Sequence, residues 1–211
     1  MIKLIQAALL VTIATFATSC QSEEFNGNEQ DDLQVNTTEL TSTMSDDEFI
    51  AACHTVKSQM GPKSRAVVMT ESGAKEIVQP FVEDGILLRE QIVKQMETSP
   101  NLKEDVLYFK ALTEEDCAAL SFTYHSMKNA GFEAQFVNNM INKKPCKLSP
   151  EAERFVHCLA VAVGYDTVKK LSVEGIITAT TVRQAIIAIG KRYLGYIGVA
   201  LVIKEFVECI E

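Results

Sequence analysis

The sequence contains no tryptophan, and its 211 residues include ten glycines and five prolines. Collagen-like and low-complexity chains are rich in glycine or proline, so the composition excludes both classes. Hydrophobic residues make up 47% of the chain, which is enough to build a packed core. We therefore expect one folded domain, with unstructured residues at its ends.

The chain also lacks the short motifs of phosphate-binding loops, calcium loops and dinucleotide-binding turns. Cys53-His54 and His157-Cys158 each place a thiol beside an imidazole, but adjacent residues of a helix point about 100° apart. Paired metal ligands on a helix sit three or four residues apart. We therefore predict no metal site, no cofactor and no enzymatic activity. A metal-dependent enzyme, or a thiol enzyme that pairs Cys53 or Cys158 with His54 or His125, is left as an alternative.

Positive charge is scarce over most of the chain. The formal net charge is −8, and residues 20–142 hold 9 basic and 21 acidic side chains, against 10 and 7 in residues 143–211. An acidic protein has little general affinity for nucleic acid, so we expect no nucleic-acid partner. The basic third could pair internally with the acidic part, or it could bind an anionic or protein partner. The candidate interaction residues are Lys143, Lys144, Lys147, Lys169, Lys170, Lys191 and Arg192.

No apolar run is long enough for a membrane-spanning helix, which takes about 20 residues. Near the C-terminus, Lys191-Arg192 interrupts the most apolar stretch and leaves 11 uncharged residues at positions 193–203. We interpret residues 180–210 as a buried core helix, kinked near Gly195. An exposed partner surface and a membrane-active segment are the alternatives for this stretch.

The N-terminus begins with a basic residue, Lys3, and continues with 14 mostly apolar residues at positions 4–17. This pattern is typical of a signal-peptide core. The run ATSC that follows, ending at Cys20, resembles a bacterial lipobox, although Ala17 stands where leucine is more common. The resemblance implies that residues 1–19 are a signal peptide and that Cys20 carries the lipid, including palmitate, that anchors the protein to a membrane. An ordinary secretory signal is the alternative.

The four residues after the cysteine, Gln21, Ser22, Glu23 and Glu24, resemble the acidic lipoprotein export signal of Bacteroidota. This resemblance implies an outer-membrane lipoprotein that faces the cell exterior. Residues 20–44 are polar and contain no lysine or arginine. They cannot bury enough apolar surface to offset the entropy of ordering, so we expect a flexible tether there. Residues 45–211 are then the single folded domain.

Helix signals dominate that domain. Ser45 and Glu48 have the spacing of a capping box, and Phe49, Cys53 and Val56 recur on one helical face. Similar signals predict helices that begin near residues 80, 100, 113, 149 and 180, while residues 66–70 could form an extended segment. The helix over residues 155–163 is apolar on nearly every side, so we expect it to be central and buried. The predicted fold class is all-α, a compact irregular bundle of about six or seven helices.

Five cysteines remain after the lipid anchor: Cys53, Cys117, Cys146, Cys158 and Cys209. Disulfides form readily outside the cytoplasm, so we expect one native disulfide. The spacing of the cysteines leaves its pairing open. All these features predict a non-enzymatic surface lipoprotein that binds a partner or acts at the cell envelope. A secreted or surface antibacterial protein, perturbing membranes through residues 143–211, is the alternative.

Overall fold

The structure is a computed structural model that describes residues 40–61, 69–129, 150–163 and 195–211. Within these ranges the chain forms six α-helices and one short 3-10 helix, with no strand, and the all-α prediction is confirmed. The elements are α2 (Asp46–Met60), α3 (Glu71–Met96), η1 (Pro100–Leu102), α4 (Lys103–Lys110), α5 (Glu114–Met127), α7 (Pro150–Val163) and α10 (Gly195–Ile210).

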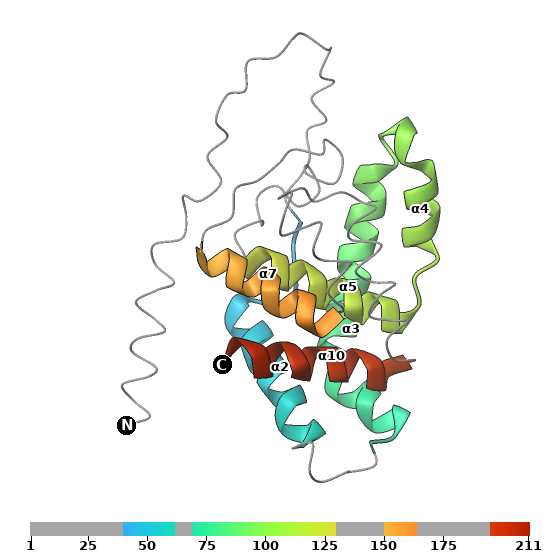
Figure 1. The fold of residues 1–211 in the computed structure, drawn as a ribbon. Coiled ribbons are helices and arrows are strands. Elements are labelled where there is room, and N and C mark those ends of the chain that lie inside the picture. Colours follow the sequence, from blue (N-terminus) through green and yellow to red (C-terminus); the bar gives the residue numbers. More distant parts are fainter. Residues whose placement is uncertain (1–39, 62–68, 130–149, 164–194) are drawn as a thin grey trace.

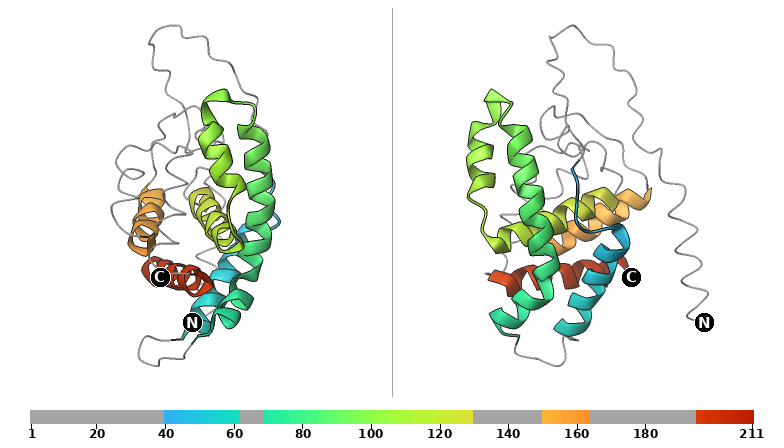
Figure 2. Two further views of the ribbon diagram at one scale, coloured as in Figure 1. Left: turned by 90° about the vertical axis from the view of Figure 1, so that its right-hand side faces the viewer. Right: turned by 180° about the vertical axis from the view of Figure 1, so that it is seen from behind.

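The long helix α3 connects two parts of the bundle (Figure 1). Its C-terminal half pairs with α4, and this helical hairpin projects away from the other helices (Figure 2). Along the rest of its length α3 packs against α5, α10 and α2, most extensively against α5. Helix α10, the last of the chain, also packs against α2, the first described helix, and against α7.

Four buried phenylalanines join four helices at the centre of the core. The ring of Phe81 on α3 lies 6.0 Å from Phe49 on α2 and 6.5 Å from Phe122 on α5. Phe122 in turn meets Phe206 on α10 edge to face, with ring centroids 5.2 Å apart. Such pairs add about 0.5–1.5 kcal/mol each beyond the area they bury. This cluster fixes how α2, α3, α5 and α10 pack together.

The first predicted helix agrees with the structure. The Ser45 hydroxyl accepts from the Glu48 amide, and the Glu48 carboxylate accepts from the Ser45 amide, which completes the capping box of α2. Phe49, Cys53 and Val56 form its buried face. The helix ends at Gly61, whose φ of 65° is in the left-handed region that suits glycine.

The second helix begins nine residues earlier than predicted, at Glu71 instead of Pro80. Pro80 lies inside α3, where it removes one backbone hydrogen bond at a cost of roughly 3 kcal/mol. Two features outweigh this cost. The Thr70 hydroxyl caps the helix by accepting from the Gly73 amide, and Ala74, Ile77 and Val78 are buried before the proline is reached. The segment at 66–70 lies largely outside the described residues.

Helix α7 begins at Pro150, as its proline predicted, but it is not buried on all sides. Cys158, Leu159 and Ala162 face the core, whereas His157 is exposed and Val161 is 42% exposed. The prediction that this helix is central and buried is therefore wrong for the face that carries His157 and Val161. Figure 1 shows α7 at the front of the bundle, above α10.

The C-terminal helix α10 begins at Gly195, which has a φ of 74°. Residues 180–194 of the predicted helix lie outside the described part. Within α10, Val199, Ile203, Phe206 and Val207 are all buried in the core. In the described ranges, no helix combines the length and the apolar character needed to cross a membrane.

Candidate functional site

The chain reaches the core before its first helix, through residues 40–44, which we call the strap. Leu40 and Met44 are each 7% exposed and belong to the hydrophobic core, although the sequence assigned them to the tether. Ser42 is half-buried between them, while Thr41 and Thr43 are exposed. Every second residue of the strap thus faces the helices, while the chain bends at Thr43 and Met44. Residues 40–44, ahead of the predicted domain start at residue 45, thus belong to the packed structure.

Asp84 of α3 accepts hydrogen bonds from three polar groups of the strap. Its Oδ1 atom lies 2.6 Å from the Ser42 hydroxyl, 2.8 Å from the Thr43 amide and 3.1 Å from the Thr43 hydroxyl. Its Oδ2 atom lies 2.7 Å from the Ser121 hydroxyl and 3.1 Å from His125 Nε2, both on α5. These five residues, the Asp84 cluster, join the strap to α3 and α5.

The carboxylate of Asp84 is fully buried. Burial alone would raise the pKa of this group, but hydrogen bonds from His125, Ser42 and Ser121 outweigh it and hold the pKa of Asp84 well below its usual range. A buried charge of this kind is tolerated only when donors surround it. The strap therefore supplies part of the donor set that this buried carboxylate needs.

Serine, histidine and aspartate together invite comparison with a hydrolase triad, but the geometry differs. In a triad the serine and the aspartate approach opposite nitrogens of the imidazole. Here Ser42 Oγ lies 3.0 Å from His125 Nε2, the same nitrogen that contacts Asp84. Since the Asp84 carboxylate only accepts, Nε2 must carry the proton, and it cannot also take one from Ser42. The three side chains therefore hold the strap, α3 and α5 together, and they do not form a proton relay.

The His125 ring is held on its other side by α2. It stacks on Phe49, with centroids 5.0 Å apart and planes 17° from parallel, and it is fully buried. Its Nδ1 atom has no hydrogen-bond partner among the described residues. The ion pair of Lys128 with Asp46, at 3.1 Å, is a second contact between the end of α5 and the start of α2. The N-terminus of α2 is thus attached to the end of α5.

A second polar group caps the start of α10. The Tyr196 amide donates to Glu71 Oε2 at 2.9 Å, and the Tyr196 hydroxyl donates to Glu114 Oε2 at 2.7 Å. Lys75 pairs with Glu114 at 2.5 Å and lies over the Tyr196 ring. A carboxylate at a helix N-terminus complements the free amides and the dipole. Glu71 of α3 therefore caps the start of α10, and Glu114 of α5 holds the Tyr196 side chain beside it.

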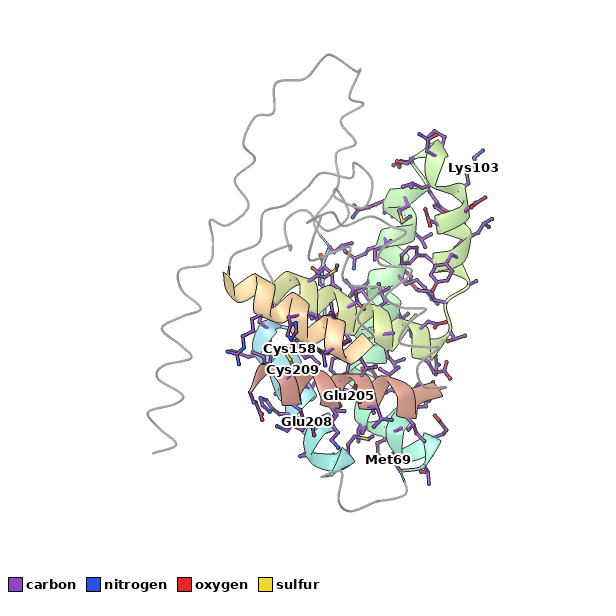
Figure 3. All side chains as sticks on the ribbon, viewed as in Figure 1. Met69, Lys103, Cys158, Glu205, Glu208 and Cys209 are labelled. Atoms are coloured by element: carbon purple, nitrogen blue, oxygen red, sulfur yellow. A yellow bond between two sulfur atoms is a disulfide. The ribbon has the colours of Figure 1, made fainter. Side chains whose placement is uncertain are left out.

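The four cysteines within the described ranges are one bonded pair and two buried free thiols. Cys158 on α7 and Cys209 on α10 form a disulfide, so the expected single bridge is present in the described residues (Figure 3). Cys53 and Cys117 are buried and free. Burial raises the pKa of the Cys53 thiol far above its ordinary value, and it raises that of Cys117 to about 11. Thiols in this state are poor nucleophiles.

The end of the chain is tied down around the disulfide. Arg154 of α7 donates to the carbonyl of Ile210 at 2.5 Å. The Glu211 side chain pairs with Lys57 of α2 and lies 3.5 Å from His54 Nδ1. The histidine of the Cys53-His54 pair thus points outward while the thiol points inward. Within the described ranges, no three His, Cys, Asp or Glu side chains gather as a metal site requires.

Several predicted site residues lie outside the described ranges. They are the lipid anchor Cys20, the export-signal residues Gln21, Ser22, Glu23 and Glu24, the cysteine Cys146, and the basic residues Lys143, Lys144, Lys147, Lys169, Lys170, Lys191 and Arg192. The predicted interaction surface therefore stays a prediction from sequence.

The sequence did not single out Asp84, although it carried a signal. Asp84 stands three residues after Phe81 and four before Leu88, so it lies on the apolar face of its helix. A carboxylate on such a face is rarely buried unless partners satisfy it. Ser121 and His125 are likewise four residues apart on α5 and share a face. That coincidence of polar residues on two buried faces was the available clue.

Comparisons with protein families, with curated proteins and with solved structures found no match to this chain. The function must therefore be argued from the residues themselves.

Proposed function

We propose that this protein is a surface lipoprotein, anchored in the outer membrane through Cys20, that acts without catalysis as a binding or envelope-interaction module. The lipobox-like run ending at Cys20 supports the anchor, and the acidic residues after it support display on the cell exterior. Acyl chains contribute about 0.8 kcal/mol per buried methylene, so two or three hold a protein stably.

The structural observation that carries the proposal is the disulfide between Cys158 and Cys209. Disulfides persist in oxidising compartments and are rare in the reducing cytosol. A bridge that connects two core helices therefore supports an exported protein. It is independent of the signal-peptide argument, because it lies at the opposite end of the chain.

Two features support a non-catalytic role. His125, which lies beside a serine and an aspartate, is fully buried. The same nitrogen of its ring, Nε2, contacts both Asp84 and Ser42. The two free thiols of the described chain are buried, with pKa values raised by burial. In both cases the polar group serves packing and orientation.

The anchor is tested by separating membrane and soluble fractions of cells that make the native chain or Cys20→Ala. We expect the native chain in the membrane fraction and Cys20→Ala outside it. Ser19→Ala is the matched control, because it changes the neighbouring position but keeps a small residue before the cleavage point. Equal membrane retention of Cys20→Ala would refute the anchor.

Display on the exterior is tested by protease treatment of intact cells. Replacing Glu23 and Glu24 by alanine should leave the protein in the membrane fraction but protect it from the protease. The control replaces Asp31 and Asp32 by alanine, which removes the same charge further along the tether. If both double variants are digested as readily as the native chain, the acidic residues after Cys20 carry no export signal.

The basic third, residues 143–211, is the proposed interaction surface. Lys169→Glu with Lys170→Glu should weaken binding of the purified chain to vesicles that contain phosphatidylglycerol, because it reverses charge within that surface. Lys94→Glu with Lys103→Glu makes the same charge change on the exposed α3–α4 hairpin and should have little effect. Equal weakening by both pairs would refute a localised surface. Release of a dye trapped in the vesicles would instead favour the membrane-perturbing alternative.

A further inference from the structure

The strap lies on α3 and α5 and is held there largely through hydrogen bonds to its main chain. Side chains of α3 bind its main chain as a neighbouring strand would. Gln91 Oε1 accepts from the Thr41 amide at 2.8 Å, and Gln91 Nε2 donates to the Thr41 carbonyl at 2.8 Å. Two turns earlier on the same helix, Asp84 accepts from the Thr43 amide. Both exposed threonines of the strap are thereby fixed through their backbone.

Apolar contacts hold the two ends of the strap. Leu40 and Met44 are buried in the core, and the Tyr124 hydroxyl of α5 lies 3.5 Å from the Leu40 carbonyl. Between them, Ser42 contacts both Asp84 and His125. The strap thus covers the line along which α3 and α5 meet, and it closes the Asp84 cluster from outside.

No backbone-to-backbone hydrogen bond ties residues 40–44 to a helix in the described chain. The strap can therefore leave without breaking any helical hydrogen bond. Its C-terminal boundary is equally independent, because Ser45 and Glu48 complete the cap of α2 between themselves. Segments with few backbone ties of this kind open at lower free energy than the helices on which they lie.

We propose that residues 40–44 form a releasable latch between the tether and the helical core, detaching as one unit while the helices stay folded. Release opens the Asp84 cluster to water and uncovers the sites of Leu40 and Met44. It also adds five residues to the free tether, which lengthens its maximum reach by about 17 Å. In the lipoprotein proposed above, any pull between membrane and domain passes through this latch, and that role rests on the proposed function.

The latch is tested by native-state amide hydrogen exchange on the chain from residue 20 onward, in solution and without lipid. The Thr41 and Thr43 amides should be protected, yet exchange at least ~100-fold faster than the Leu88 amide inside α3. Gln91→Ala should speed exchange at Thr41 by about 10-fold, since it removes both hydrogen bonds to that residue, and it should leave Leu88 unchanged. Ser42→Ala is a second variant and should speed exchange at Thr43.

The matched control is Gln79→Ala, on the same helix. The Gln79 side chain donates its hydrogen bond to Glu83 and not to the strap. Its replacement should leave the Thr41 and Thr43 rates as they are. The latch is refuted if these two amides exchange as slowly as Leu88, because the strap would then open only with global unfolding. It is equally refuted if they exchange at the rate of an unstructured peptide.

The latch and the lipid anchor can be refuted independently of each other. The exchange rates are measured without a membrane, so a strap that does not detach leaves the lipid on Cys20 untouched. Conversely, a chain that proves to be secreted without lipid would still have a latch, which would then control only the exposure of the Asp84 cluster.

Discussion

Gly85 on α3 lies directly against the main chain of Cys117 on α5. A Cβ atom added to Gly85 would sit 1.8 Å from the Cys117 carbonyl oxygen, far inside van der Waals contact. The two helices therefore cross with their backbones touching, which only glycine permits. This close approach brings the neighbouring Asp84 within reach of Ser121 and His125. The Asp84 cluster thus depends on a neighbouring residue that has no side chain.

Gly85→Ala should lower the free energy of unfolding by about 3 kcal/mol. The added methyl group meets backbone that cannot rotate away, and overpacking of this kind outweighs the gain of about 1 kcal/mol in helix propensity. Chemical denaturation measures the change. Gly73→Ala is the control, since its nearest neighbours are side-chain atoms at 3.3 Å, and it should change stability by less than about 1 kcal/mol. Equal effects would contradict the close crossing.

Asp84→Asn should cost roughly 3 kcal/mol at pH 7, because the donors around the buried carboxylate lose their charged acceptor. The pKa of Asp84 is lower in the folded than in the unfolded chain. Its stabilising contribution is therefore complete above the unfolded value of about 3.9, and it is lost as the pH falls toward the folded value. Denaturation at pH 7 and pH 3 should show the native chain losing more stability than Asp84→Asn. Parallel losses would contradict this account of the carboxylate.

Replacing Cys158 and Cys209 by alanine should lower stability by about 3–4 kcal/mol. The bridge closes a sequence separation of 51 residues, and the chain-entropy argument gives about 4 kcal/mol for a loop of that length. Thermal unfolding with and without dithiothreitol provides the measurement. Reductant should lower the melting temperature of the native chain and leave the double variant unchanged. A variant that still responds to reductant would place a structural disulfide elsewhere.

Gly195→Ala should destabilise the protein by about 2 kcal/mol. Its φ of 74° disfavours any residue with a Cβ, and that atom would lie 2.8 Å from the Glu71 carboxylate oxygens. The cap that Glu71 provides to the Tyr196 amide would be displaced at the same time. Gly195→Asn tests how much of this destabilisation comes from the backbone conformation, since asparagine tolerates the left-handed region better than alanine does. If alanine and asparagine are equally well accepted, the positive φ is not required.

Local signals in the sequence predicted the helices well where caps and apolar faces coincide, as at Ser45, Glu48 and Phe49. They failed at Pro80, because the burial of Ala74, Ile77 and Val78 depends on helices far away in the sequence. Periodicity shows which face of a helix is apolar, but it does not show which partner covers that face.

The Asp84 cluster could not be predicted from the sequence, for the same reason. Its members come from positions 42, 84 and 121–125, about 40 residues apart, and no local pattern links them. The strap was assigned to the tether because its polar composition fits a disordered segment. Gln91 and Asp84, which lie about 40 to 50 residues away in the sequence, supply hydrogen bonds that hold it in place. The proposed anchor at Cys20 is the reverse case, because the evidence for it lies in a few adjacent residues.

The most direct test of the account is the mass of the N-terminal peptide from the protein purified out of its native membrane. We predict a peptide that begins at Cys20 and carries the added mass of a diacylglyceryl group, with or without a third acyl chain. A peptide that begins at Cys20 or at a neighbouring residue without lipid would contradict the account, as would one that retains residues 1–19.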